Sequence, residues 1–135
     1  MEIRFDPIKN KSGEIIEALM ASPDMPDDDA LLFKIRLCIE EVVENIVSYA
    51  YSHDDGWIIA KTERLGDVVV ISLRDAGIPF DPLAKADPDI TLPAEAREIG
   101  GLGIFLCKKM MDAVRYEYTD GCNVFTMEKK INNEQ

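Results

Sequence analysis

The chain has 135 residues and a formal net charge of −11, from 26 acidic and 15 basic side chains. Such a surface would repel phosphates, so nucleic acids and anionic membranes are not expected partners. The composition, 47% hydrophobic and 30% charged, is that of an ordinary globular protein, and no apolar run approaches the roughly 18 residues of a membrane span. We expect one cytoplasmic domain over residues 1–135, in which three cysteines without CxxC spacing are buried thiols.

The N-terminal part predicts a short strand and two helices. Residues 2–6 alternate in polarity and suggest an edge strand, and Ser12 is the expected cap of a helix that runs to about residue 21. Beyond two prolines, a second helix begins near Asp28. Its apolar residues recur every three or four positions until the pattern fades near Ser52, as expected of a helix that lies on a core.

The middle of the chain predicts a hairpin followed by a long loop. Residues 57–64 and 67–74 have the composition of two antiparallel strands joined at Leu65-Gly66. Residues 76–100 have no convincing regular pattern and contain four of the seven prolines. Structureless loops longer than roughly 12–15 residues are usually functional lids or disordered, so this loop is a candidate lid.

The C-terminal part predicts a third helix, ending near Asp112, and two strands at 113–119 and 122–130 joined by the turn Asp120-Gly121. No repeat or linker divides the chain. Strands paired by hairpins, with helices grouped on one face, predict an α+β protein: a two-layer α/β sandwich with a mixed, mostly antiparallel sheet.

Glu41 and Asn45 are the first candidate site residues. They are four apart in the second predicted helix, so their side chains lie one turn apart on a shared face. A carboxylate and a carboxamide at the edge of a core suit a site that needs a base and a neutral metal-binding oxygen. The same spacing is common on solvated helix faces, so the pair gains weight only from two stretches further along the chain.

The first of these stretches starts with Asp75, which continues a row of three aliphatic residues along the strand and should therefore face the core. A buried carboxylate is costly unless something hydrogen-bonds to it, and an exocyclic amine such as that of adenine can do so. Gly77 has no side chain and allows a flat ligand to approach the backbone closely. The alternative is an ordinary turn at the end of a hairpin strand.

The second stretch, Gly100-Gly101-Leu102-Gly103, opens the third predicted helix. Backbone N–H groups and the positive end of the helix dipole converge there, which makes an anion site suited to phosphates. The stretch is not a Walker loop, because GxxxxGK(S/T) is absent, and not a dinucleotide fingerprint, because a proline-rich loop precedes it. A flexible hinge is the alternative.

Together, the three stretches resemble the N, G1 and G2 boxes of the gyrase, Hsp90, histidine-kinase and MutL (GHKL) ATPases. The matching segments are Glu41-Val-Val-Glu-Asn45, Asp75-Ala-Gly77-Ile-Pro-Phe80-Asp81-Pro82 and Gly100-Gly101-Leu102-Gly103-Ile104. In spacing, lid and size the chain is most similar to anti-sigma-factor serine/threonine kinases of the RsbW type. The resemblance spans about Asp28 to Ile131 and implies the Bergerat ATP-binding fold, with ATP and Mg²⁺ as cofactors.

The resemblance also implies a role for each matching residue. Glu41 would be the general base, Asn45 would coordinate Mg²⁺, and Asp75 would bind the adenine amine. The lid would cover about residues 76–100, and from its position in that loop alone Arg97 is the cation expected to reach the terminal phosphate. The full set of implied nucleotide-binding positions is Asn45, Asp75, Gly77, Phe80, Arg97, Gly101, Leu102 and Gly103.

Two features depart from the family pattern. Relatives often carry a histidine where this chain has Tyr49, and the only histidine, His53, lies in the turn beyond the helix. A phosphoacceptor helix is not expected within 135 residues, which favours a free-standing regulator over a sensor-kinase fragment.

The resemblance implies two protein partners: a STAS-type anti-sigma factor antagonist that is phosphorylated, and a sigma factor that is sequestered. A homodimer through residues 2–6 is a family-level expectation only. Two other functions stay open, namely a nucleotide-gated binding module without phosphoryl transfer and a scaffold that binds no nucleotide. Glu41 favours the kinase, since a pure binder has no need of a base.

Overall fold

The computed structural model describes residues 1–52, 56–84 and 102–131. Its helices are α1 (Ser12–Met20), α2 (Asp29–Tyr49) and α3 (Leu102–Met110). Its strands are β1 (Glu2–Phe5), β2 (Ile58–Leu65), β3 (Val68–Asp75), β4 (Ala113–Thr119) and β5 (Cys122–Lys130). The strands form one sheet in the order β1-β2-β3-β5-β4, and all four pairings are antiparallel.

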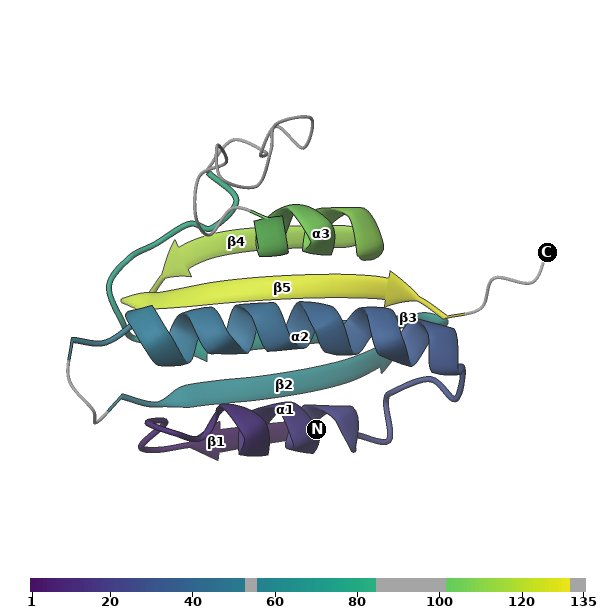
Figure 1. The fold of residues 1–135 in the computed structure, drawn as a ribbon, viewed down its shortest axis with the longest axis horizontal. Coiled ribbons are helices and arrows are strands. Elements are labelled where there is room, and N and C mark those ends of the chain that lie inside the picture. Colours follow the sequence, from purple (N-terminus) through teal and green to yellow (C-terminus); the bar gives the residue numbers. More distant parts are fainter. Residues whose placement is uncertain (53–55, 85–101, 132–135) are drawn as a thin grey trace.

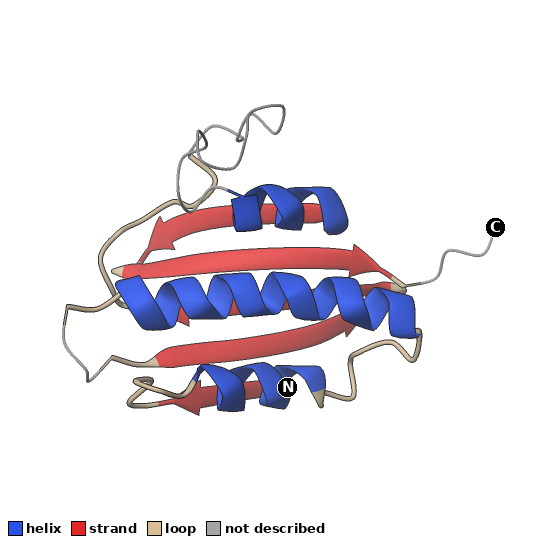
Figure 2. Cartoon of the chain, viewed as in Figure 1, coloured by secondary structure: helices blue, strands red, loops and turns tan. Residues whose placement is uncertain are grey.

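The helices lie side by side on one face of the sheet, with α2 in the centre (Figures 1 and 2). This arrangement confirms the predicted two-layer α/β sandwich of the α+β class. The sheet differs from the expectation in one respect, because it is antiparallel throughout and not mixed. Strands β3 and β4 run parallel and are joined by a crossover through α3, but β5 lies between them and is antiparallel to both, so no parallel pair is hydrogen-bonded.

Helix α2 forms because its start is capped and its apolar stripe meets the sheet. The Asp28 carboxylate accepts hydrogen bonds from the N–H groups of Ala30 (2.8 Å) and Leu31 (3.1 Å), which satisfies two of the free donors of the first turn. The buried stripe consists of Leu31, Ile35, Cys38, Ile39, Val42, Val43 and Ile46. Each fully buried aliphatic side chain contributes about 1.5–3 kcal/mol to folding, so this stripe fixes α2 on the sheet.

Strand β3 supplies the sheet side of the core. Its inward row, Val69, Ile71 and Leu73, is fully buried, and Asp75 continues the row with 3% of its surface exposed. The prediction that Asp75 faces the helices is therefore confirmed. On β5, Phe125 and Met127 extend the same buried layer.

Helix ends differ from the predictions where tertiary contacts override local signals. Ser12 is the first residue of α1 and not its cap, and its hydroxyl donates to Glu44 Oε1 at 3.2 Å. Helix α2 ends at Tyr49 and not near Ser52. The chain leaves the helix there because the Tyr51 hydroxyl donates to the Trp57 carbonyl (2.6 Å) and accepts from Ala76 N–H (2.8 Å).

The strands agree more closely with the predictions. The β2–β3 turn lies at Gly66-Asp67, one residue later than expected, since Leu65 pairs with Val68. Strands β4 and β5 and their turn at Asp120-Gly121 are confirmed. Helix α3 ends at Met110 and not near Asp112, whose N–H already donates to the Glu128 carbonyl on β5 at 2.9 Å.

Two smaller expectations also have an outcome. The three cysteines are free and buried, as predicted. Of the helices in the described part of the chain, none combines the length and the apolar character needed to cross a bilayer.

We expect Thr62→Val to destabilise the fold. Thr62 is fully buried on β2; its hydroxyl donates to Asp24 Oδ2 at 2.7 Å and shares a hydrogen bond with Ser22 Oγ at 2.7 Å. Valine keeps the shape but leaves Ser22 and Asp24 without this partner, so chemical denaturation should show a loss of about 1–3 kcal/mol in unfolding free energy.

Thr126→Val is the matched control. Thr126 is half-buried on the helix-free face of the sheet, opposite Ser72, and should change stability by less than about 0.5 kcal/mol. Equal effects of the two substitutions would show that β-propensity, and not the buried hydrogen bonds, controls both.

Candidate active site

The Asp75 carboxylate is buried, and its two oxygens have different surroundings. Oδ1 accepts hydrogen bonds from Gly77 N–H (2.9 Å) and from Asn123 Nδ2 (3.0 Å). Among the described residues, Oδ2 has no donor. Burial raises the pKa of Asp75 above its usual range, and the hydrogen bonds from Asn123 and Gly77 lower it in part. The site therefore offers an acceptor oxygen on a carboxylate that is largely removed from water.

Asn123, near the start of β5, is a site residue that the sequence did not indicate. It is directly opposite Asp75 in the sheet register and is 7% exposed. Its amide nitrogen donates to Asp75 Oδ1 and to the Ile78 carbonyl, each at 3.0 Å, and lies 3.4 Å from the Gly77 carbonyl. Its oxygen accepts from Phe80 N–H (3.1 Å) and from the Tyr116 hydroxyl.

Residues 76–84 form an irregular strap after β3. Ile78 N–H donates to the carbonyl of Ala50, the C-cap residue of α2, at 2.7 Å. A Cβ at Gly77 would overlap the Ala50 backbone, so this glycine lets the strap pack against the end of α2. Ile78 and Phe80 point outward, with 59% and 62% of their surfaces exposed. An aromatic and an aliphatic side chain are thus free to contact a ligand beside Asp75.

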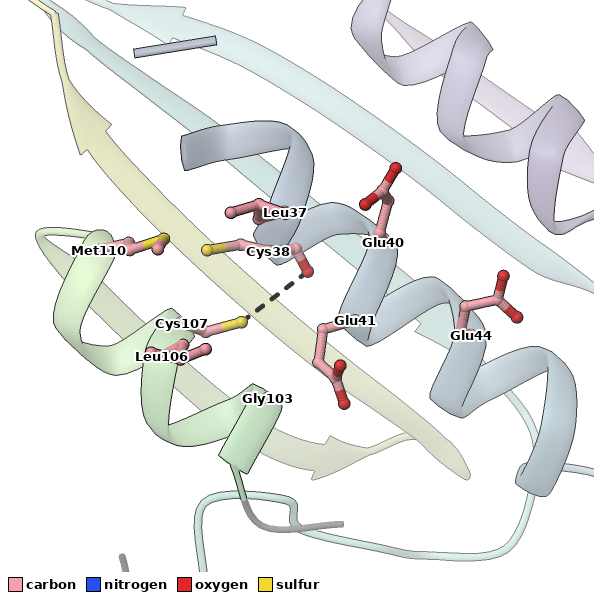
Figure 3. Close-up of a pocket in the computed structure, with 9 residues that line it drawn as sticks. All are labelled: Leu37, Cys38, Glu40, Glu41, Glu44, Gly103, Leu106, Cys107 and Met110. Carbon is pink, nitrogen blue, oxygen red and sulfur yellow. Dashed lines mark hydrogen bonds between the residues drawn. The ribbon is translucent and has the colours of Figure 1, made fainter. Parts of the chain in front are cut away.

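Glu41 and Gly103 meet where α2 and α3 face each other (Figure 3). A Cβ at Gly103 would overlap the Glu41 carboxyl group in its present position, so a side chain there would displace that carboxyl group. Gly103 is the second residue of α3, and the positive end of that helix dipole therefore faces the carboxylate. The structure brings together a predicted base and a predicted phosphate-binding residue that are 62 positions apart in the sequence.

A cavity of about 230 Å³ extends from this contact along the groove between the two helices. Its lining residues are Leu37, Cys38, Glu40, Glu41, Glu44, Gly103, Leu106, Cys107 and Met110 (Figure 3). Cys107 Sγ lies 3.9 Å from the Cys38 carbonyl oxygen. The contact with the Cys38 thiol, together with burial, raises the pKa of Cys107, so this thiol stays protonated and acts as core. Asp75 does not line this cavity.

Asn45 lies on α2 between the two parts of the site. It is half-buried, one turn beyond Glu41 and five residues before Ala50. The described residues contain no group of three or more His, Cys, Asp or Glu side chains that could hold a metal ion. A single carboxamide suits Mg²⁺ that takes its remaining ligands from phosphates and water, so Asn45 fits the predicted metal role.

Several predicted site residues lie outside the described part of the chain. They are Arg97, Gly100, Gly101 and residues 85–100 of the expected lid, so their roles stay predictions. Leu102 begins α3. Asn123 could have been suspected from the sequence only as a polar residue directly after a hairpin turn, because its partner Asp75 is 48 positions away.

A profile of the histidine kinase-like ATPase domain matches residues 13–129 of the chain. The serine-protein kinase RsbW of Listeria monocytogenes serotype 4a (strain HCC23) is 31% identical over 106 residues, which cover 75% of this chain and 67% of the relative. RsbW of Bacillus cereus (strain AH187) is 33% identical over 105 residues, covering 75% and 65%. The serine/threonine-protein kinase BtrW of Bordetella bronchiseptica (strain ATCC BAA-588 / NCTC 13252 / RB50) is 31% identical over 98 residues, covering 72% and 69%.

Among solved structures, a nucleotide-free form of the catalytic domain of histidine kinase ThkA has a TM-score of 0.59 at 18% identity, and the match covers 99% of each chain. A second nucleotide-free form has a TM-score of 0.57. At this identity the likeness concerns the fold alone, and it confirms the predicted two-layer arrangement.

We expect Asp75→Asn to leave the fold at least as stable as the wild type at pH 7. Because burial raises the pKa of Asp75 in the folded chain, the wild type loses stability as the pH rises through that pKa and the carboxylate becomes charged. The asparagine oxygen can still accept from Gly77 N–H and Asn123, and it never ionises. Unfolding free energy should be unchanged or higher by about 1 kcal/mol.

Thermal unfolding of both proteins from about pH 3.5 to about pH 8, a range that begins near the ordinary pKa of an unfolded aspartate, is the measurement. The difference between them should shrink toward low pH, where the wild-type carboxyl is also neutral. A variant that is much less stable than the wild type at every pH would contradict this account of the charge.

Proposed function

Because the chain belongs to the family of histidine kinase-like ATPase domains, we propose that it binds Mg-ATP and phosphorylates a serine or threonine of another protein. One observation carries the proposal: the two parts of the site lie along one helix, α2. Asp75 and the strap meet its C-terminal end at Ala50, and Glu41 meets Gly103 nine residues earlier. Nine residues of helix span about 13.5 Å, a length suited to an extended nucleoside triphosphate.

The residues at the Ala50 end of α2 would hold the adenine ring. Asp75 Oδ2 would accept a hydrogen bond from the exocyclic amine of adenine, with Gly77 and Phe80 beside the ring. The burial of Asp75 supports this role, because a hydrogen bond to a desolvated carboxylate is stronger than one in water.

The residues at the α3 end would hold the phosphates. N–H groups of the first turn of α3, around Leu102 and Gly103, would bind phosphate oxygens, and Asn45 would ligate Mg²⁺ between the two ends. ATP supplies the phosphoryl group. Arg97 from the lid and Gly101 from the glycine stretch remain predicted phosphate contacts.

Glu41 would act as the general base. Its carboxylate would take the proton of the acceptor hydroxyl, whose oxygen forms the bond to the γ-phosphorus. The bond from that phosphorus to the bridging oxygen of the β-phosphate breaks, and ADP leaves. Phosphoryl transfer depends mainly on positioning and charge stabilisation, so these few residues are sufficient.

The names of the relatives support the kinase, and the sequence resemblance suggests its partners. We propose that the acceptor is a STAS-type anti-sigma factor antagonist and that the chain sequesters a sigma factor in the cytoplasm, as a monomer or homodimer. The relatives are named serine-protein kinases. A nucleotide-gated binding module that transfers no phosphate would use the same pocket.

Titration calorimetry with ADP and ATP, with and without Mg²⁺, tests the pocket first. The wild type should bind both nucleotides more tightly with Mg²⁺, and Asp75→Asn should weaken ADP binding by about 10–100-fold, the value of a hydrogen bond to a charged group. If the wild type binds neither nucleotide, the chain is a scaffold and the proposal fails.

We expect Glu41→Gln to retain ADP binding within about twofold and to lower phosphoryl transfer by about 10²–10⁴-fold, the usual contribution of a general base. Glutamine keeps the size of the side chain and its contact with Gly103. Transfer of label from γ-labelled ATP to purified STAS-domain proteins is the measurement.

Glu44→Gln is the matched control, because Glu44 lies on the same helix and lines the same groove. This control should transfer phosphate at the wild-type rate. Undiminished transfer by Glu41→Gln would remove the general-base role. Tight nucleotide binding by the wild type without any transfer would favour the binding module.

A further inference from the structure

The Asn123 side chain is fully satisfied, and its orientation is fixed by the chemistry of its partners. Phe80 N–H can only donate, so the atom facing it must be the carboxamide oxygen. The Ile78 carbonyl can only accept, so the atom facing it must be the nitrogen. The Tyr116 hydroxyl also donates to the carboxamide oxygen, so both N–H groups and both oxygen lone pairs of the Asn123 side chain are used. A flipped amide would lose these contacts, so Asn123 cannot turn.

Asn123 therefore constrains which oxygen of Asp75 is free and which charge state of Asp75 is favoured. Its N–H occupies Oδ1 together with Gly77 N–H, which leaves Oδ2 as the oxygen available to a ligand. A hydrogen bond from an N–H group is stronger to a charged oxygen than to a neutral one, so this contact also favours the ionised carboxylate over a protonated one. The same side chain holds the strap through Ile78 and Phe80.

We infer that Asn123 is the positioning residue that makes the site selective for 6-aminopurine over 6-oxopurine nucleotides. An ionised Asp75 accepts from a 6-amino group and repels a 6-oxo group. A protonated Asp75 could donate to the 6-oxo group, so selectivity depends on the charge state that Asn123 maintains. The inference rests on the proposed nucleotide binding.

The test is Asn123→Asp, measured by calorimetry with ADP and with inosine diphosphate, which differs by a 6-oxo group. Two buried carboxyl groups facing each other would share a proton, which favours the neutral form of Asp75. The wild type should prefer ADP by about 100-fold or more. In the variant, ADP affinity should fall by about 10–100-fold and the preference by at least about tenfold.

The pH dependence of ADP binding gives a readout that a merely structural role would not move. Loss of ADP affinity on acidification should begin at a higher pH in Asn123→Asp than in the wild type. Among the described residues, Tyr51 beyond α2 and Tyr116 on β4 interact electrostatically with Asp75, while Cys122 on β5 and Asp81 in the strap interact with these tyrosines. Burial raises the pKa of both tyrosines, so neither titrates between pH 5 and 8.

Two further variants keep the result interpretable. Tyr116→Phe removes one donor to Asn123 and serves if Asn123→Asp does not fold; it should lower ADP affinity by about 3–10-fold and reduce the preference in the same direction. Thr126→Val, on the other face of β5, should match the wild type. A folded Asn123→Asp with the wild-type preference and pH profile would overturn the inference alone. A wild type that binds neither nucleotide would overturn the proposed function as well.

Discussion

The Asp75 carboxylate lies at the end of a buried aliphatic row, and the protein must offset the cost of removing that charge from water. The donors that do so come from two different segments, the strap at Gly77 and strand β5 at Asn123. Asn123 in turn requires acceptors and donors of its own, which Ile78, Phe80 and Tyr116 supply. The position of one charge thus determines the path of the strap.

Two glycines make the site compact. Gly77 lies against the last carbonyl of α2, and Gly103 lies against the Glu41 carboxyl group. A side chain at Gly77 would push the strap away from the backbone of α2, and a side chain at Gly103 would displace the Glu41 carboxyl group. The helix α2 is the common support, because each glycine approaches it from a different element. If the chain binds ATP as proposed, these two contacts set the distance between the adenine site and the site of the reacting phosphate.

Local signals in the sequence were enough to predict the elements and the three motifs. The inward direction of Asp75 followed from strand alternation, and the hairpin at Asp120-Gly121 followed from turn chemistry. Separate roles for Glu41 and Gly103 were implied by the family resemblance, but the contact between them is visible only in the structure.

The predictions that failed for Ser12, for the end of α2 and for Asn123 share one cause. In each case the residue is held by a hydrogen-bond partner that is distant in the sequence. Ser12 was expected to cap α1, yet its hydroxyl binds Glu44 on another helix. The end of α2 is set by Tyr51, whose partners are Trp57 and Ala76. Asn123 was not recognised because the register between β3 and β5 cannot be read from either strand alone.

The strap contacts also bear on the order in which the domain assembles. Ile78 reaches back to Ala50, and Asn123 reaches Asp75 across 48 positions of the sequence. Such non-local contacts form only after long loops have closed, which places them late in folding. A fragment that lacks β5 would retain all three sequence motifs but not the side chain that holds Asp75. The pocket is therefore a property of the complete sheet.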